Sequence, residues 1–151
     1  MSGALSHNPS QIVRQLLIDL ALASDGGASW PVYATQEANS PDATITVYDT
    51  AGRLQGKVLP IKEVHILRGV QINIRASDAT TGYKKADDIA IALDQVALST
   101  VNVTDPSGYG TATQAYTIYN IARAGDIIPV PQPSSNLKVY TVNVLVNLKQ
   151  S

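Results

Sequence analysis

Apolar residues follow two different spacings along this chain, and the spacings predict its secondary structure. Between residues 9 and 23 they recur every three or four positions, which is typical of an amphipathic helix. That stripe consists of Ile12, Val13, Leu16, Leu17, Leu20 and Ala21. A second stripe predicts a helix over residues 81–97 and consists of Tyr83, Ala86, Ala90, Leu93 and Ala97.

Signals at the ends of the first helix support its placement. Asn8 is a favourable N-cap, and Pro9 suits the first helical position. The sequence SDGG at 24–27 is expected to end the helix. The polar stripe of this helix is narrow, so a second surface should cover it in addition to its own sheet. That surface is either more of the core or another subunit.

Alternation of apolar and polar residues predicts the strands. The clearest run covers residues 70–76, and a second ends the chain, with Tyr140, Val142, Val144, Val146 and Leu148 on one face. Further strands are expected at 30–34, 43–50, 100–104 and 115–122. Between them we expect a turn at 51–53, an irregular extended stretch at 55–69 broken by Pro60, a loop at 105–111 and a proline-rich bend at 128–135.

The order of these elements predicts the fold class. Helix, strands, helix and strands indicate one α+β domain over residues 9–149, after a flexible N-terminus at residues 1–8. The sheet should be mixed or mostly antiparallel, with both helices packed on one face. At 151 residues the chain can bury a core of its own without cysteines, of which it has none.

Composition points toward assembly. Only 15% of the residues are charged and the net charge is −1, whereas an average soluble domain has about 25% charged residues. Such a surface repels its own copies weakly, and it lacks the basic face that nucleic-acid binding requires. No segment reads as a signal peptide or a membrane span, so we expect synthesis and folding in the cytoplasm.

The sequence offers little evidence for a catalytic or ligand-binding site. TTGYKKA at 80–86 has one glycine and lacks the P-loop pattern, and Asp78 can occupy the nearby helix N-terminus itself. His7 and His65 have no partner at metal-ligand spacing, and Asp87 and Asp88 point in different directions on a helix. Ser107 has no evident triad partner. We therefore predict no enzyme activity, no catalytic residue, no metal and no cofactor.

Cations gather between the second and third strands, at Arg53, Lys57, Lys62 and Arg68. Arg123 and Asp126 mark the exit of a later strand. Standing alone, these residues are typical of solvated loop charge.

Three segments, VYDTAGRLQGKVLP, GVQINIRASDATTGYKKADDIAIALDQV and IARAGDIIPVPQP, resemble the minor capsid or tail-terminator family of long-tailed bacteriophages. The resemblance covers residues 10–148, although its individual motifs are short. It implies a subunit that forms a ring, six-fold in this family, on the tail tube. That ring stops tube polymerisation and joins the tail to the head connector.

The resemblance also implies roles for single residues. Asp49, Thr50, Gly52 and Arg53 would form a hairpin loop, and Arg75 would close the third strand. Gly82, Tyr83 and Lys85 would start the second helix, with Tyr83 inward and the lysines outward, and the terminal strand would end the sheet. Subunit or ring contacts are expected at Arg53, Lys57, Arg68, Lys84, Lys85 and Arg123.

The partners implied are further copies of the chain, the tail tube protein and the head–tail connector, in the virion. DNA would only pass through the lumen, and no membrane is involved. Two alternatives remain open: a head-completion or neck adaptor on the connector side, and a small enzyme or ligand-binding domain.

Overall fold

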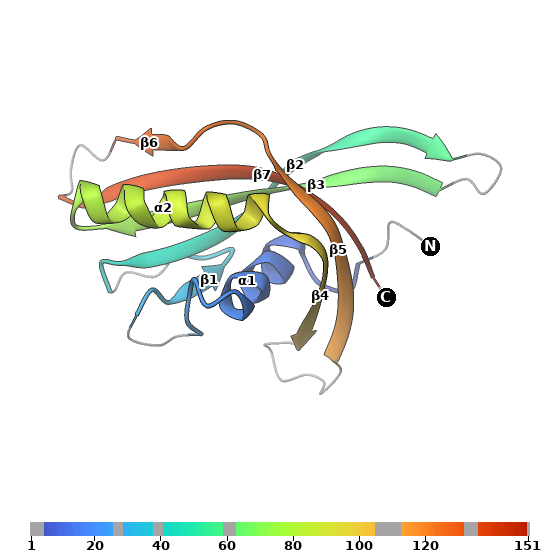
Figure 1. Ribbon diagram of the computed structural model, residues 1–151, viewed down its shortest axis with the longest axis horizontal. Coiled ribbons are helices and arrows are strands. Elements are labelled where there is room, and N and C mark those ends of the chain that lie inside the picture. Colours follow the sequence, from blue (N-terminus) through green and yellow to red (C-terminus); the bar gives the residue numbers. More distant parts are fainter. Residues whose placement is uncertain are drawn as a thin grey trace.

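The chain folds into a single α+β domain in which two helices pack on a curled, mixed sheet, as the sequence predicts (Figure 1). The computed structural model describes residues 5–25, 29–37, 41–58, 63–104, 113–131 and 136–150, without the side chains of 55–58 and 63–65. The elements are α1 (Pro9–Asp19), β1 (Val32–Ala34), β2 (Thr44–Val58), β3 (Glu63–Ala76), α2 (Ala79–Asp94), β4 (Ala97–Thr104), β5 (Thr113–Arg123), β6 (Ile128–Val130) and β7 (Lys138–Gln150).

The strands form one sheet in the order β1-β2-β3-β7-β5-β4, and β6 pairs with β7 beyond the end of β5. The pairing of β1 with β2 is parallel, whereas all other strand pairs are antiparallel. The last strand, β7, lies between β3 and β5 in the middle of the sheet. The expectation that the terminal strand ends the sheet is therefore wrong.

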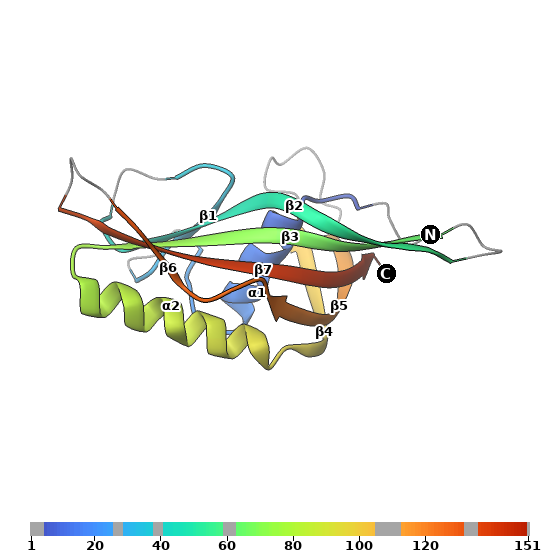
Figure 2. The same ribbon diagram turned by 90° about the horizontal axis from the view of Figure 1, so that it is seen from above.

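The two helices pack on different parts of the sheet. Helix α2 contacts β3, β5 and β7, while α1 contacts β1, β2, β3 and also β4, at the far end of the strand order. The sheet must curl for both of its ends to reach α1 (Figures 1 and 2). Ile12, Leu17, Ile72, Ile89 and Tyr116 are among the fully buried side chains of the shared core.

Helix α1 begins as predicted but ends at Asp19, four residues before Ala23. The N–H of Ala21 donates to Ile18 O and the N–H of Leu22 to Leu17 O, both at 3.0 Å, and Ala21 has φ +59°. These are the bonds of a Schellman motif, which ends a helix through a left-handed residue. Leu20 and Ala21, predicted in the buried stripe, are consequently exposed.

The segment between residues 51 and 69 differs most from expectation. The predicted turn at 51–53 lies within β2, which runs on to Val58 against β3, with register shifts after Thr50 and Leu54. Strand β7 pairs with β3 only up to Arg68. Residues 51–58 and 63–67 therefore form a two-stranded ribbon, here called the arm, which projects past the core (Figures 1 and 2). The expected break at Pro60 lies outside the described residues.

Other predicted boundaries differ slightly from those of the structure. Helix α2 spans Ala79–Asp94 and not 81–97, so Ala97 begins β4. Part of the expected bend at 128–135 forms the short strand β6, and residues 132–135 lie outside the described chain, as does the predicted loop at 105–111. Neither described helix is long and apolar enough to cross a membrane.

Candidate functional site

The base of the arm is tied to the start of α1 by Asp49. Its carboxylate accepts hydrogen bonds from the Ser10 backbone N–H (2.8 Å) and from the Ser10 hydroxyl (2.9 Å). Ser10 is fully buried and lies in the first turn of α1, where backbone N–H groups have no partner within the helix. Asp49 thus caps a helix from a neighbouring strand, and the expectation that it forms a hairpin loop is wrong.

Two glycines face each other where the arm leaves the sheet. A Cβ built on Gly52 would lie 2.0 Å from Leu67 O, and one built on Gly69 would lie 2.5 Å from Ala51 O. The two backbones therefore approach more closely than side chains allow. The DTAGR segment forms this close approach, here called the glycine crossing, within a strand pair. The Cβ built on Gly69 would also lie 2.5 Å from Thr50 Oγ1.

Beyond the crossing, the arm carries both apolar and basic residues, and each of its faces has an apolar side chain. Leu54 lies opposite Ile66, and Arg53 lies opposite Leu67. Leu54 is 71% exposed, and Arg53 is exposed as well. Lys57 lies in β2, and its side chain is outside the described set.

Arg68 is half-buried beside β7, at the point where the arm leaves the sheet. It lines a cavity of about 320 Å³ together with Asn8, Asp49 and Gly52. The structure thus brings Arg53 and Arg68 to one end of the molecule.

The TTGYKKA segment starts α2, and Asp78 caps it. The Asp78 carboxylate accepts from the Thr81 backbone N–H and from the Thr81 hydroxyl, both at 3.0 Å. These bonds lower the pKa of Asp78 below its ordinary value, the backbone bond most strongly. The protein therefore supplies its own anion at this helix N-terminus, as the sequence indicated.

Gly82, and not Tyr83, faces inward at the start of α2. A Cβ on Gly82 would meet the Tyr140 ring at 3.0 Å, and Gly82 is buried. Tyr83 is 50% exposed and contacts Tyr140 edge-on, with ring centroids 5.8 Å apart. The prediction that Tyr83 packs inward is wrong because the close approach of β7 leaves room only for glycine.

The two lysines of α2 also differ from each other. Lys84 points outward and pairs with Asp88 at 3.5 Å, the i,i+4 pair that the sequence predicts. Lys85 is half-buried, with its ammonium 5.3 Å from the centroid of the Trp30 ring. Burial lowers the pKa of Lys85, partly offset by Asp88. The expectation that both lysines face solvent is therefore wrong for Lys85.

Arg123, at the end of β5, binds the C-terminal end of α2. Its Nη2 lies 2.8 Å from Asp94 Oδ2, and its Nε donates to both carboxylate oxygens at 3.1 and 3.0 Å. The hydrogen bonds to Asp94 raise the pKa of Arg123. Lys84, Lys85 and Arg123 therefore lie around α2, apart from the arm, so the six predicted contact residues fall into two groups.

A stripe on α2 that is exposed except at the half-buried Asp87 escaped the sequence analysis. Tyr83, Asp87, Ile91 and Asp94 are spaced by four, four and three residues, so they share one side of the helix. Ile91 is 46% exposed although it is large and apolar. The same spacing rule that found the buried stripe would have found this second one, which we call the outer stripe.

Arg75 lies on the sheet face away from the helices, one residue before the end of β3, and does not itself close the strand. It is only 8% exposed. It donates to Glu37 at 2.8 Å and to Pro41 O at 2.9 Å, so it anchors the segment before β2. Nearby, Thr141 donates to Asn73 at 2.9 Å beside a cavity of about 240 Å³.

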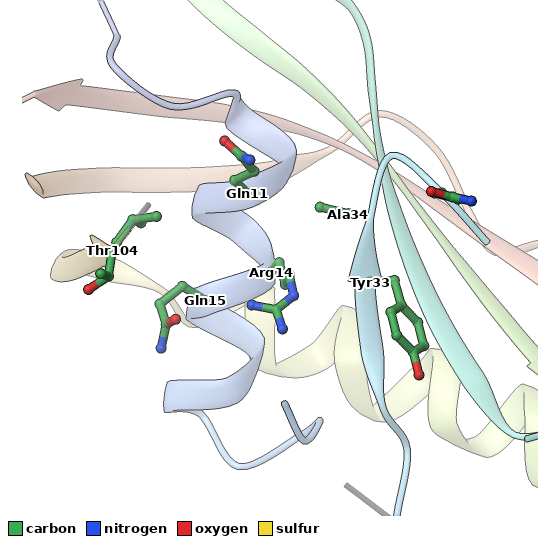
Figure 3. A pocket seen from close by; sticks show the side chains of 8 residues that line it. Gln11, Arg14, Gln15, Tyr33, Ala34 and Thr104 are labelled. Atoms are coloured by element: carbon green, nitrogen blue, oxygen red, sulfur yellow. The ribbon is translucent and has the colours of Figure 1, made fainter. Parts of the chain in front are cut away.

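A larger cavity, of about 430 Å³, opens between α1, β1 and β4 (Figure 3). Gln11, Gln15, Tyr33 and Thr104 contribute to its lining. Arg14 also lines it, but its guanidinium donates to Val32 O at 3.0 Å and pairs with Asp25. The arginine therefore fastens α1 to the edge of the sheet.

His7 contacts the side chain of Tyr116 in β5. Its Nδ1 lies 2.7 Å from the Tyr116 hydroxyl, and the Ser6 N–H donates to Gln150 at 2.8 Å. Burial raises the pKa of Tyr116. Residues 5–8 are thus tied to β5 and β7, while residues 1–4 lie outside the described chain.

Within the described part of the chain, no three His, Cys, Asp or Glu side chains gather as a metal site would require. No protein-family model matches the sequence, and no curated protein matches it significantly.

Proposed function

We propose that this protein is a virion structural protein of a long-tailed bacteriophage, a tail terminator whose ring caps the tail tube. The observation that carries the proposal is the arm: a ribbon that leaves the core through a glycine crossing and carries exposed basic and apolar residues. The family resemblance over residues 10–148 supplies the identity of the assembly.

The mechanism is geometric. A ring needs head-to-tail contacts between unlike surfaces that close on themselves. One ring face complements the end of the tail tube, whereas the other accepts no further tube protein and meets the head connector, so growth stops. The low charge of the chain, 15% of residues, suits such close packing of identical copies.

Electron microscopy of lysates from a phage that lacks this gene tests the proposal. Headless tails of uncontrolled, excessive length are the expected result. Tails of normal length beside unjoined, DNA-filled heads would move the protein to the neck as a connector-side adaptor. Intact virions would overturn the structural role.

A further inference from the structure

We propose that the arm of one copy binds the outer stripe of α2 on a second copy, so that the subunits join head to tail. The inference rests on the proposed ring and names the contact that builds it. Four observations carry it: the uncovered arm, the uncovered stripe, their opposite charges and their separation within one chain.

Among the described residues, no other element of the chain covers the arm. A two-stranded ribbon without a packed face is marginally stable in water. From residue 51 on, the only described strand beside β2 is β3, and β7 ends its pairing with β3 at Arg68. The Leu54–Ile66 pair therefore has no sheet partner beside it, and Leu54 stays 71% exposed.

The outer stripe offers a surface of matching size and pattern. Tyr83 and Ile91, 50% and 46% exposed, alternate along it with Asp87 and Asp94. From Tyr83 to Asp94 it measures about 16 Å at 1.5 Å per residue. The β2 side of the arm, residues 51–58, extends about 23 Å at 3.3 Å per residue, so it can span the stripe.

The charges of the two surfaces are opposite. The arm carries Arg53 and Lys57 against a single acidic residue, with Arg68 at its base, whereas α2 and its cap carry four aspartates and two lysines. Within the stripe, Asp94 already pairs with Arg123 at 2.8 Å, so Asp87 carries the negative charge that the arm would meet. Opposite charge steers the two surfaces together and fixes their register.

The partner must be a second copy, because the two surfaces cannot meet within one chain. The arm projects from one end of the long axis, and α2 lies along the other half (Figures 1 and 2). A contact between two different surfaces of identical chains is heterologous, and it generates a ring where the rotation closes.

Engineered disulfides test the contact directly, since the natural chain contains no cysteine. Oxidation of L54C/I91C should give a ladder of covalent multimers that ends at the closed ring. This should hold in purified protein and in assembled tails. The control pair L54C/L20C places the second thiol on the residue that follows α1, which is 40% exposed, and it should give no ladder. A ladder from the control alone, or from neither pair, would overturn the contact.

Charge exchange supplies an independent readout in native mass spectrometry. R53E and D87R should each reduce the multimeric fraction severalfold, and R53E/D87R should restore it. Two single variants that assemble like the wild type, or a double variant without recovery, would contradict the inference.

The two proposals can fail separately. If tails keep their controlled length while L54C/I91C fails to cross-link, the arm contact is refuted and the terminator function is retained. If deleting the gene leaves tail length unchanged while L54C/I91C still cross-links into rings, the terminator function is refuted and the arm contact is retained.

Discussion

At the scale of single residues, the arm depends on two glycines that let the backbones of its strands approach closely where it leaves the sheet. In Gly52→Ala the new methyl group would collide with Leu67 O, a backbone atom that a side-chain rotation cannot move. Overpacking of this kind typically costs about 1–3 kcal/mol. We therefore expect urea denaturation to give a lower unfolding free energy by that amount. Gly125→Ala is the control, because a Cβ there meets nothing within 4 Å; equal losses in both variants would contradict the crossing.

A second residue-scale prediction concerns the end of α1. Ala21 occupies a left-handed conformation with φ +59°, which costs an L-residue roughly 1–2 kcal/mol relative to glycine. Ala21→Gly should therefore raise the unfolding free energy by about 1 kcal/mol, since Ala21 is exposed and loses little packing. Ala92→Gly, in the interior of α2, should lower it by about 0.5–1 kcal/mol. A loss of stability in both variants would show that the left-handed strain at Ala21 is absent.

At the scale of elements, the cap of α2 makes stability depend on pH. The bonds from Thr81 lower the folded-state pKa of Asp78 below its ordinary value of 3.8. The unfolded chain therefore binds the proton more readily, so the stabilisation is fully present above pH 3.8 and disappears as the pH falls through the folded-state pKa. In Asp78→Asn, which keeps a capping side chain without the charge, the stability difference from wild type should shrink over that acidic range. Urea midpoints measured from pH 6 to pH 2 check this, and parallel curves would refute it.

The elements also show which features sequence patterns can predict. Periodicity located both helices and the strand at 70–76 because their apolar stripes face a core. It failed in the arm, where no core lies behind the strands and where Gly52 indicated a turn although it permits a crossing. The inward position of Gly82 and the capping of Ser10 by Asp49 depend on β7 and β2, which are distant in sequence, so local spacing could not predict them. The six candidate cations fell into two groups for the same reason.

At the scale of the whole molecule, folding and assembly use different parts of the chain. None of the described, buried hydrophobic residues lies between Val47 and Val70, so the arm contributes nothing to the described core. By contrast, α1 lies against β1, β2, β3 and β4 and holds the curled sheet together. A protein arranged in this way can lose its arm without losing its fold.

Removal of the arm tests that separation. In the variant, residues 53–67 are replaced by Asn-Gly, a pair that forms the tight turn of a two-residue hairpin. The core is left intact, so we expect a far-ultraviolet spectrum and a cooperative melt close to those of the wild type. Native mass spectrometry should nevertheless find only monomers, because the proposed contact with the outer stripe is gone. The matched control, Leu20→Ser, changes an exposed apolar residue just after α1 and should leave assembly unchanged. A variant without the arm that still forms multimers would place the subunit contact elsewhere, and one that fails to fold would show that the arm belongs to the folding unit.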